Sequence, residues 1–121
     1  MATVRYIVDD VDAAVKFYTE LLDFELEEHM GAPFALISYG DLSLWLSGPR
    51  SSAAKPMPDG RQPAPGGWNR LVIEVRDIES VVSRLLKANV PFRNSILSGP
   101  GGSQVLCEDP SGNAVEIFQP R

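Results

Sequence analysis

The chain has very few residues that could ligate a soft metal ion or form a covalent bridge. Its 121 residues include one cysteine, Cys107, and one histidine, His29. A single cysteine excludes an intramolecular disulfide and a paired-cysteine metal or redox site. A single histidine argues against zinc, non-haem iron and most general-base sites, which use several histidines or a histidine with a positioned partner. Cys107 alternates with the apolar Val105, which predicts a small core side chain rather than a nucleophile.

Positive charge and long apolar runs are also scarce. The chain has eleven lysines and arginines and sixteen acidic residues, which gives a net charge of −5. This balance argues against nucleic acid and anionic membrane as partners, because both are bound through clustered cations. No apolar run approaches the ~20 residues that span a bilayer. The opening MATVRYIV lacks the apolar core of a signal peptide, so we expect a cytoplasmic protein.

The overall composition is ordinary for a globular protein, and the sequence contains an internal repeat. With 44% apolar and 22% charged residues, the chain predicts a single domain over residues 1–121. TVRYIVDD at 3–10 aligns without a gap with RLVIEVRD at 70–77. Each of these strand-like runs is followed by an amphipathic helix, over 11–22 and 78–88, with Asp10 and Asp77 as the N-caps.

The second helix has an apolar stripe of Ile78, Val81, Val82, Leu85 and Leu86, which periodicity assigns to the core. Three further strands are expected after each helix, over 25–29, 33–39 and 42–47, and over 92–97, 103–108 and 113–118. The fold class is therefore α+β, built from two strand-helix-three-strand (βαβββ) modules. Module 1 covers about 3–47, module 2 about 68–120, and between them a connector of about 48–67 is rich in proline and glycine.

Period-two alternation gives each predicted sheet an apolar face for the helices and a mixed reverse face. The reverse face carries small and charged residues, which a solvent-facing sheet would explain. It also carries Trp45 and Phe118 in mid-strand. Because a covered aromatic side chain buries on the order of 150–250 Å², these two residues favour a partly dry pocket over a bare surface.

The two V-x-D strand ends, Val8–Asp10 and Val75–Asp77, and the closing EDPSGNAVEIFQP resemble the vicinal oxygen chelate superfamily. Its members include glyoxalase I, extradiol dioxygenases, and fosfomycin- and bleomycin-resistance proteins. The resemblance runs from residue 3 to residue 120. It implies a curved mixed sheet around a central cleft, usually completed by a homodimer.

In metal-dependent members of that superfamily, the positions equivalent to Thr3, Trp45, Arg70 and Glu116 hold the metal. Only Glu116 could do so here, because tryptophan offers no donor atom and arginine repels a cation. We therefore expect no metal and no other cofactor. We expect Arg70 and Glu116 to form an ion pair instead, and Glu116→Ala to lower the melting temperature, since breaking a buried pair costs about 3–5 kcal/mol.

The resemblance is nearest to the metal-free, antibiotic-binding branch, which holds a drug without altering it. The sequence thus predicts a binding protein that sequesters a small planar or aromatic, antibiotic-like molecule. The expected ligand-binding residues are Phe34, Trp45, Trp68, Arg70, Glu116 and Phe118. Trp68 could equally cap the core.

Three alternatives remain open at this stage. One is a glyoxalase-like lyase or isomerase with Glu116 as general base, although a neighbouring Arg70 would disfavour proton uptake. Another is a metalloenzyme with ligands recruited from Glu74 or from aspartates. The third is a regulatory module with an empty cleft.

Overall fold

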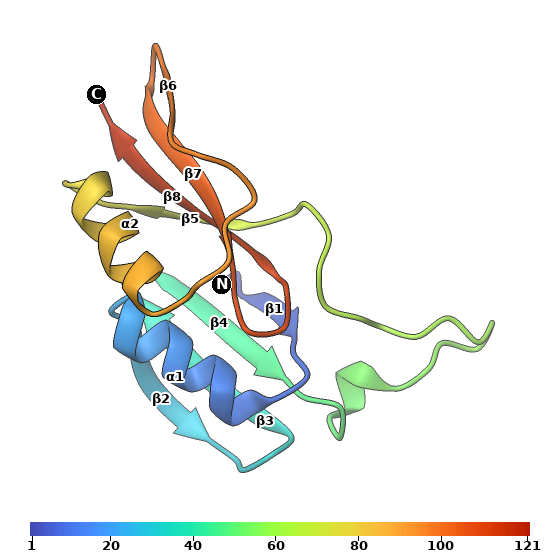
Figure 1. Ribbon diagram of the computed structural model, residues 1–121. Coiled ribbons are helices and arrows are strands. Elements are labelled where there is room, and N and C mark those ends of the chain that lie inside the picture. The colour runs from blue at the N-terminus through green and yellow to red at the C-terminus, as the bar shows by residue number, and fades with distance from the viewer. The chain divides into compact units, whose positions relative to one another are not determined.

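The computed structural model describes residues 1–121 and divides into two compact units, Met1–Gly66 and Gly67–Arg121. Each unit contains one helix and one four-stranded sheet, in the order strand, helix, three strands (Figure 1). The first unit consists of β1 (Val4–Ile7), α1 (Val11–Leu21), β2 (Glu25–His29), β3 (Phe34–Tyr39) and β4 (Leu42–Ser47). The second consists of β5 (Leu71–Glu74), α2 (Ile78–Lys87), β6 (Leu97–Gly99), β7 (Gly102–Glu108) and β8 (Ala114–Pro120). The predicted α+β class and the βαβββ modules are confirmed.

The two sheets share one topology. Their strand orders are β1-β4-β3-β2 and β5-β8-β7-β6, so the first and last strands of each unit are parallel neighbours. The other pairs are antiparallel. A parallel pair needs a crossover, and the helix of each unit supplies it. Residues at the start and at the end of a unit are thereby placed side by side.

The two helices begin through the same local device. The Asp10 carboxylate accepts a hydrogen bond from the Ala13 N–H, and the Asp77 carboxylate accepts one from the Ser80 N–H, both at 3.1 Å. An N-cap of this kind satisfies one of the backbone donors that a helix start leaves free. Both predicted caps are confirmed.

The core of each unit lies between its helix and one face of its sheet. In the first unit the wholly buried side chains come from α1, β3 and β4: Ala14, Tyr18, Ala35, Ile37, Leu44 and Leu46. In the second unit they include Leu85, Val105, Cys107, Val115 and Ile117. Cys107 is therefore the core side chain that its alternation with Val105 predicted.

Two expectations for the second unit are wrong. The strand expected over 92–97 does not form before Leu97: Phe92 makes one isolated bridge with Cys107, and the Asn94 side chain accepts the Leu106 N–H at 2.9 Å. A side-chain acceptor thus replaces the ladder partner, and β6 starts only at Leu97. In addition, α2 does not bury its whole apolar stripe, because Leu86 is 56% exposed.

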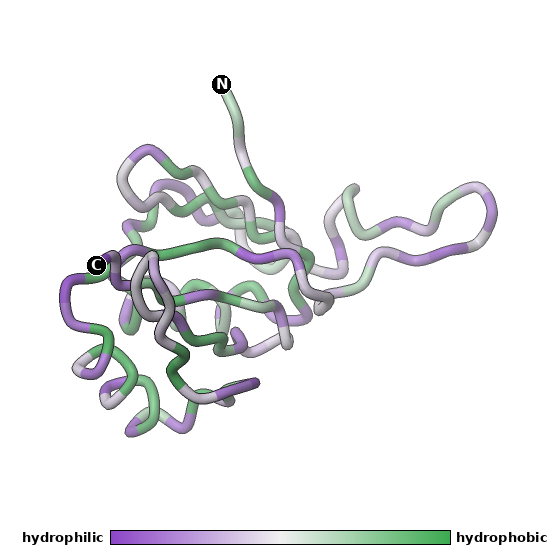
Figure 2. The backbone as a smooth tube through the Cα atoms, turned by 90° about the horizontal axis from the view of Figure 1, so that it is seen from above, coloured by the Kyte–Doolittle hydropathy of each residue, from purple (hydrophilic) through white to green (hydrophobic).

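The segment between β4 and β5 contains one short 3-10 turn, η1 (Ser52–Ala54), and no strand or α-helix. In Figure 2 it is the long loop at the right, coloured mostly purple and pale, which shows that it carries few strongly apolar residues. No helix is both long and apolar enough to cross a membrane.

Candidate functional site

The parallel pairing of β5 and β8 brings Arg70 and Glu116 together in the second unit. Arg70 directly precedes β5, and the register of Val72 with Glu116 places the carboxylate next to it. The Arg70 Nε donates to Glu116 Oε1 at 3.1 Å. The Glu116 side chain is 10% exposed and that of Arg70 is 31% exposed. The predicted ion pair is confirmed, and its arginine is partly exposed to solvent.

A second arginine fixes the segments around this pair. Arg93 donates from Nε to Glu108 Oε2 at 2.8 Å, and from its two terminal nitrogens to the carbonyls of Gly67 at 2.7 Å and Gly112 at 3.0 Å. These bonds join β7, the start of the second unit and the turn before β8. Arg93 is thus an internal clamp whose donors are largely used.

Trp68 lies on this clamp. The Arg93 guanidinium carbon is 4.6 Å from the Trp68 ring centroid, a cation–π contact, and Arg70 donates to the Trp68 carbonyl at 3.4 Å. Trp68 nevertheless remains 69% exposed. Trp68 therefore does not cap the core but presents its indole to solvent. We call Trp68, Arg70, Arg93, Glu108 and Glu116 the arginine–tryptophan cluster.

Phe118 lies two residues beyond Glu116 on the same face of β8, where its register partners are Glu74 and Gln104. It lines a groove of about 250 Å³ beside the β6–β7 hairpin. Gly102 starts β7 there with φ +145°, and a Cβ at this position would collide with the Gln119 carbonyl oxygen. Glycine is therefore required for the close approach of β7 to β8.

The first unit forms a separate aromatic group. Arg5 and Trp45 are register partners on β1 and β4, and the Arg5 guanidinium carbon is 4.9 Å from the Trp45 ring centroid. Phe34 meets Trp45 edge to face at 5.7 Å between ring centroids. Ser47, which pairs with Phe34, has a buried hydroxyl without a hydrogen-bond partner.

The six predicted ligand-binding residues are thus distributed over both units. Phe34 and Trp45 come together in the first unit, and Trp68, Arg70, Glu116 and Phe118 lie along one face of the second. The prediction missed Arg5 and Arg93, which hold the two tryptophans. Arg5 lies between Val4 and Tyr6, so period-two alternation is a signal that could have placed it on the reverse face, but nothing in the sequence signals the partners of Arg93.

The donor chemistry at the positions that the resemblance assigns to a metal does not fit a divalent ion. In the second unit Arg70, a fixed cation, is bonded to Glu116. In the first unit the indole of Trp45 offers no lone pair to a metal. No group of three or more histidine, cysteine, aspartate or glutamate side chains is close enough to share an ion.

The cysteine and the histidine lie apart from both aromatic groups. Burial, followed by repulsion from Asp109, raises the pKa of the Cys107 thiol to about 12, which keeps it protonated and unreactive. His29 on β2 contacts the Asp12 carboxylate of α1 at 2.9 Å. Neither residue takes part in the candidate site.

Comparison with known proteins identifies the fold. The sequence model of the Glyoxalase/Bleomycin resistance protein/Dioxygenase superfamily matches residues 1–117. A lactoylglutathione lyase from Agrobacterium tumefaciens superposes with a TM-score of 0.75 at 21% identity, covering 98% of this chain and 92% of that one. No match to a curated protein was found.

Two further solved structures are similar over the whole chain. The fosfomycin resistance protein FosX from Listeria monocytogenes has a TM-score of 0.76 at 10% identity and is covered over 93% of its length. TnmS3, an antibiotic binding protein from Streptomyces sp. CB03234, has a TM-score of 0.69 at 23% identity and is covered over 97%. At these identities the likeness concerns the fold alone.

Proposed function

Because the chain belongs to the glyoxalase/bleomycin resistance protein/dioxygenase superfamily, we propose that it binds a small planar aromatic molecule, without metal, and holds it unchanged. The observation that carries this proposal is the arginine–tryptophan cluster. It combines an exposed indole, in contact with Arg93 on one side, with an ion pair where metal-dependent members of the superfamily hold their metal. Sequestration of an antibiotic-like compound is the function that such a site serves best.

The indole of Trp68 supports an aromatic ligand. One ring face is backed by the Arg93 guanidinium, and the side chain is 69% exposed. A ring held from behind loses little freedom when a ligand stacks on its open face, which favours binding. Phe34 and Trp45, both half-buried, form a second aromatic group on the first unit.

The carboxylate of Glu116 supports a ligand that carries an N–H or O–H group. Its Oε1 accepts from Arg70, and the second carboxylate oxygen can accept from the ligand. A hydrogen bond to a charged acceptor contributes about 1.5–3 kcal/mol. We therefore expect ligands with an amine or a phenol beside a flat ring system.

The competing proposal is an enzyme with Glu116 as general base. One of the similar structures, the lactoylglutathione lyase, is an enzyme. A proton taken up by Glu116 would remove the charge that Arg70 pairs with, so the contact at 3.1 Å disfavours this role. The antibiotic binding protein from Streptomyces has the same fold and is consistent with a non-catalytic role.

The experiment is a tryptophan-quenching titration against planar antibiotics and flavins, with the ligand recovered and identified afterwards. We expect saturable quenching in the wild type and in Trp45→Phe, and binding weakened about 3- to 10-fold in Trp68→Leu through the loss of stacking. Intact recovered ligand supports sequestration. A chemically altered ligand would establish an enzyme, and the absence of quenching across the panel would contradict the proposal.

The metal-independent part of the proposal has its own test. Elemental analysis of protein purified without added metal should find no stoichiometric metal, and ligand binding should survive treatment with a chelator. Quenching that disappears with the chelator and returns with a divalent ion would show that the donor assignment at Arg70 and Glu116 is wrong.

A further inference from the structure

The groove beside the β6–β7 hairpin has walls that carry few side chains. Three of the residues that line its volume of about 250 Å³ are glycines, Gly99, Gly101 and Gly102, and the ring of Phe118 and the amide of Gln104 also line it. All its lining residues belong to the second unit, and none of them is charged. We call it the hairpin groove.

Two of these glycines are not required by the backbone or by packing. Of the ten glycines of the chain, seven have a positive φ, and a Cβ on Gly48 would lie 2.6 Å from the Ala32 carbonyl oxygen. Only Gly99 and Gly101 combine an ordinary φ with no atom within 4 Å of the place where a Cβ would lie. Glycine costs more chain entropy on folding than any other residue. What the missing side chains preserve at these two positions is the space of the hairpin groove.

Hydrogen bonds from the last residue hold the tip of the hairpin in place. The Arg121 backbone N–H donates to the Gly101 carbonyl at 3.1 Å, and its guanidinium donates to the Gly99 carbonyl at 3.0 Å. Gly99 also pairs with Gly102 across the hairpin, which rises at the top of Figure 1. A groove whose walls are already ordered loses little freedom when a ligand enters it, which favours binding.

The lining of the hairpin groove indicates what it can hold. Gln104 and Phe118 are register partners, so an amide lies beside an aromatic ring on the face of the sheet that also carries Glu116. The Gln104 side chain makes no hydrogen bond within the protein, so its donor and its acceptor are both available. Complete pockets for drug-sized ligands have about 300–1,000 Å³. The groove therefore fits part of a ligand, and that part is an uncharged ring with a hydrogen-bonding edge.

We propose that the hairpin groove binds an uncharged ring substituent of the ligand, packed against Phe118 and hydrogen-bonded to Gln104, and that Gly99 and Gly101 admit it by lacking side chains. The inference rests on the proposed function in one respect, namely that the flat core of the same ligand lies at the arginine–tryptophan cluster. Glu116 and Phe118 are two residues apart on β8, about 7 Å along a strand, so one ligand can reach both.

The test uses benzamide, an uncharged ring with an amide edge, and the backbone amide NMR signals of the protein. Benzamide should shift the signals of residues 97–104 and of Phe118 saturably. Benzoate and benzylamine have nearly the same size but are charged, and they should bind at least tenfold more weakly, because the groove offers a charge no partner.

Two variants test the roles of the lining residues. Gly99→Val adds a side chain on the face that Leu97 and Gln104 share, so it should weaken benzamide binding at least tenfold. The melting temperature of Gly99→Val should not fall, because no atom is near the new Cβ and valine favours strands. Gln104→Met keeps the size of the side chain and should weaken binding about fivefold through the lost hydrogen bond.

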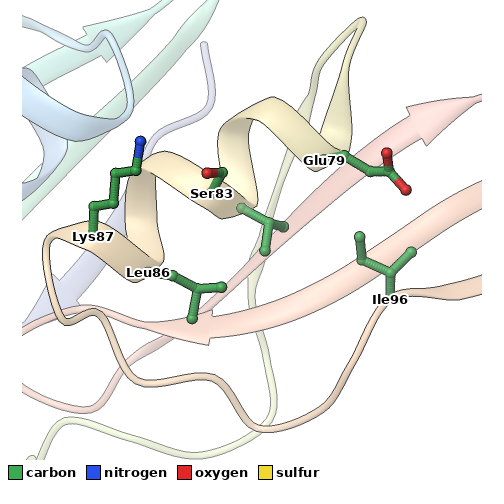
Figure 3. A pocket seen from close by; sticks show the side chains of 6 residues that line it. Glu79, Ser83, Leu86, Lys87 and Ile96 are labelled. Atoms are coloured by element: carbon green, nitrogen blue, oxygen red, sulfur yellow. The ribbon is translucent and has the colours of Figure 1, made fainter.

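A second groove of the same unit supplies the matched control. It lies beside α2, has a volume of about 420 Å³, and contains Leu86 and Ile96 together with the charged Glu79 and Lys87 (Figure 3). Ser83→Val adds the same side chain to this groove and should leave benzamide binding unchanged. Equal shifts at both grooves would show unspecific binding and overturn the proposal.

Other outcomes separate the hairpin groove from the proposed function. Benzamide that binds Gly99→Val as well as the wild type overturns the proposal, and so does a Gly99→Val protein that melts well below the wild type, because Gly99 would then be needed for packing. Saturable Trp68 quenching by a panel compound with an uncharged ring substituent, at equal affinity in both proteins, overturns it too but retains the proposed function. Benzamide bound in the groove, with no quenching by any panel compound, supports the groove and contradicts the proposed function.

Discussion

The equivalent positions of the two units bind an arginine by different chemistry. Trp45 on β4 and Glu116 on β8 occupy matching places in their sheets, and each contacts a guanidinium, Arg5 at 4.9 Å from the ring centroid and Arg70 at 3.1 Å. The ion pair was expected because the family resemblance brings the positions of Arg70 and Glu116 together around a metal, and here these positions carry opposite charges. The sequence did not predict the Arg5 contact, because a ring face gives no charge signal.

The two partners of the ion pair should differ in their cost of removal. Without Arg70, the carboxylate of Glu116, 10% exposed, is left unpaired, whereas Arg70, 31% exposed, can be rehydrated once Glu116 is removed. We expect Arg70→Gln to cost about 3 kcal/mol of unfolding free energy and Glu116→Gln about 1 kcal/mol, less than an entirely buried pair. Urea unfolding of both variants and of the double variant measures this difference and the coupling. Equal costs with no coupling would show that the two charges are independently solvated.

Cys107 should make stability depend on pH in the alkaline range. Its pKa rises from the ordinary 9.0 to about 12 on folding, mainly through burial. Between these values the unfolded chain releases a proton that the folded chain retains, so the contribution is complete below pH 9.0 and is lost as pH rises toward 12. Wild type should lose roughly 1.4 kcal/mol per pH unit more than Cys107→Ala in this window. Parallel curves for the two proteins would contradict the burial of the thiol.

At the scale of elements, the sequence predicted what local signals determine. The N-caps Asp10 and Asp77 each bond to a backbone N–H three residues further along the chain, so both helix starts could be located from local sequence. The segment 92–97 was expected to be a strand because it is a short run bounded by turn residues. Its backbone path depends instead on the Asn94 and Arg93 side chains, whose partners on β7 and at Gly67 lie far along the chain.

For helix α2 too, the sequence predicted only part of what the structure shows. Its periodicity correctly predicted an amphipathic helix, and Ile78 and Leu85 are buried as expected. How wide the covered stripe is depends on the neighbouring segment, and that segment leaves Leu86 in contact with solvent. Periodicity gives the direction of a helix's apolar face but not the amount of it that the protein buries.

At the scale of the whole molecule, internal repetition was enough to predict the architecture. The two modules have the same sequence pattern, and their sheets have the same strand order. Ligand choice could not be predicted in this way. Structures with the same fold include a lactoylglutathione lyase and an antibiotic binding protein, at 21% and 23% identity to this chain, so the fold alone does not determine the ligand.

Limited proteolysis should separate the two units. The segment between β4 and β5 has few structured residues, and the Arg61 side chain is 84% exposed. We expect trypsin to cut first after Arg61, because exposed irregular backbone opens at little cost in free energy. Mass spectrometry identifies the first fragments, and Arg61→Gln should delay the cut. First cleavage within α2, after Arg84 or Lys87, would show that the helix is less stable than the connecting segment.

The crossover that brings β5 and β8 together also fixes when the site can exist. The Arg70–Glu116 contact spans 46 residues, and β8 is the inner strand between β5 and β7. A chain still emerging from the ribosome displays Trp68 and Arg70 long before Glu116 has been synthesised. A premature stop codon ahead of β8 removes the acidic partner and the strand on which the sheet is assembled. The Arg70–Glu116 pair, and with it the binding site proposed around it, can therefore form only after β8 has been synthesised.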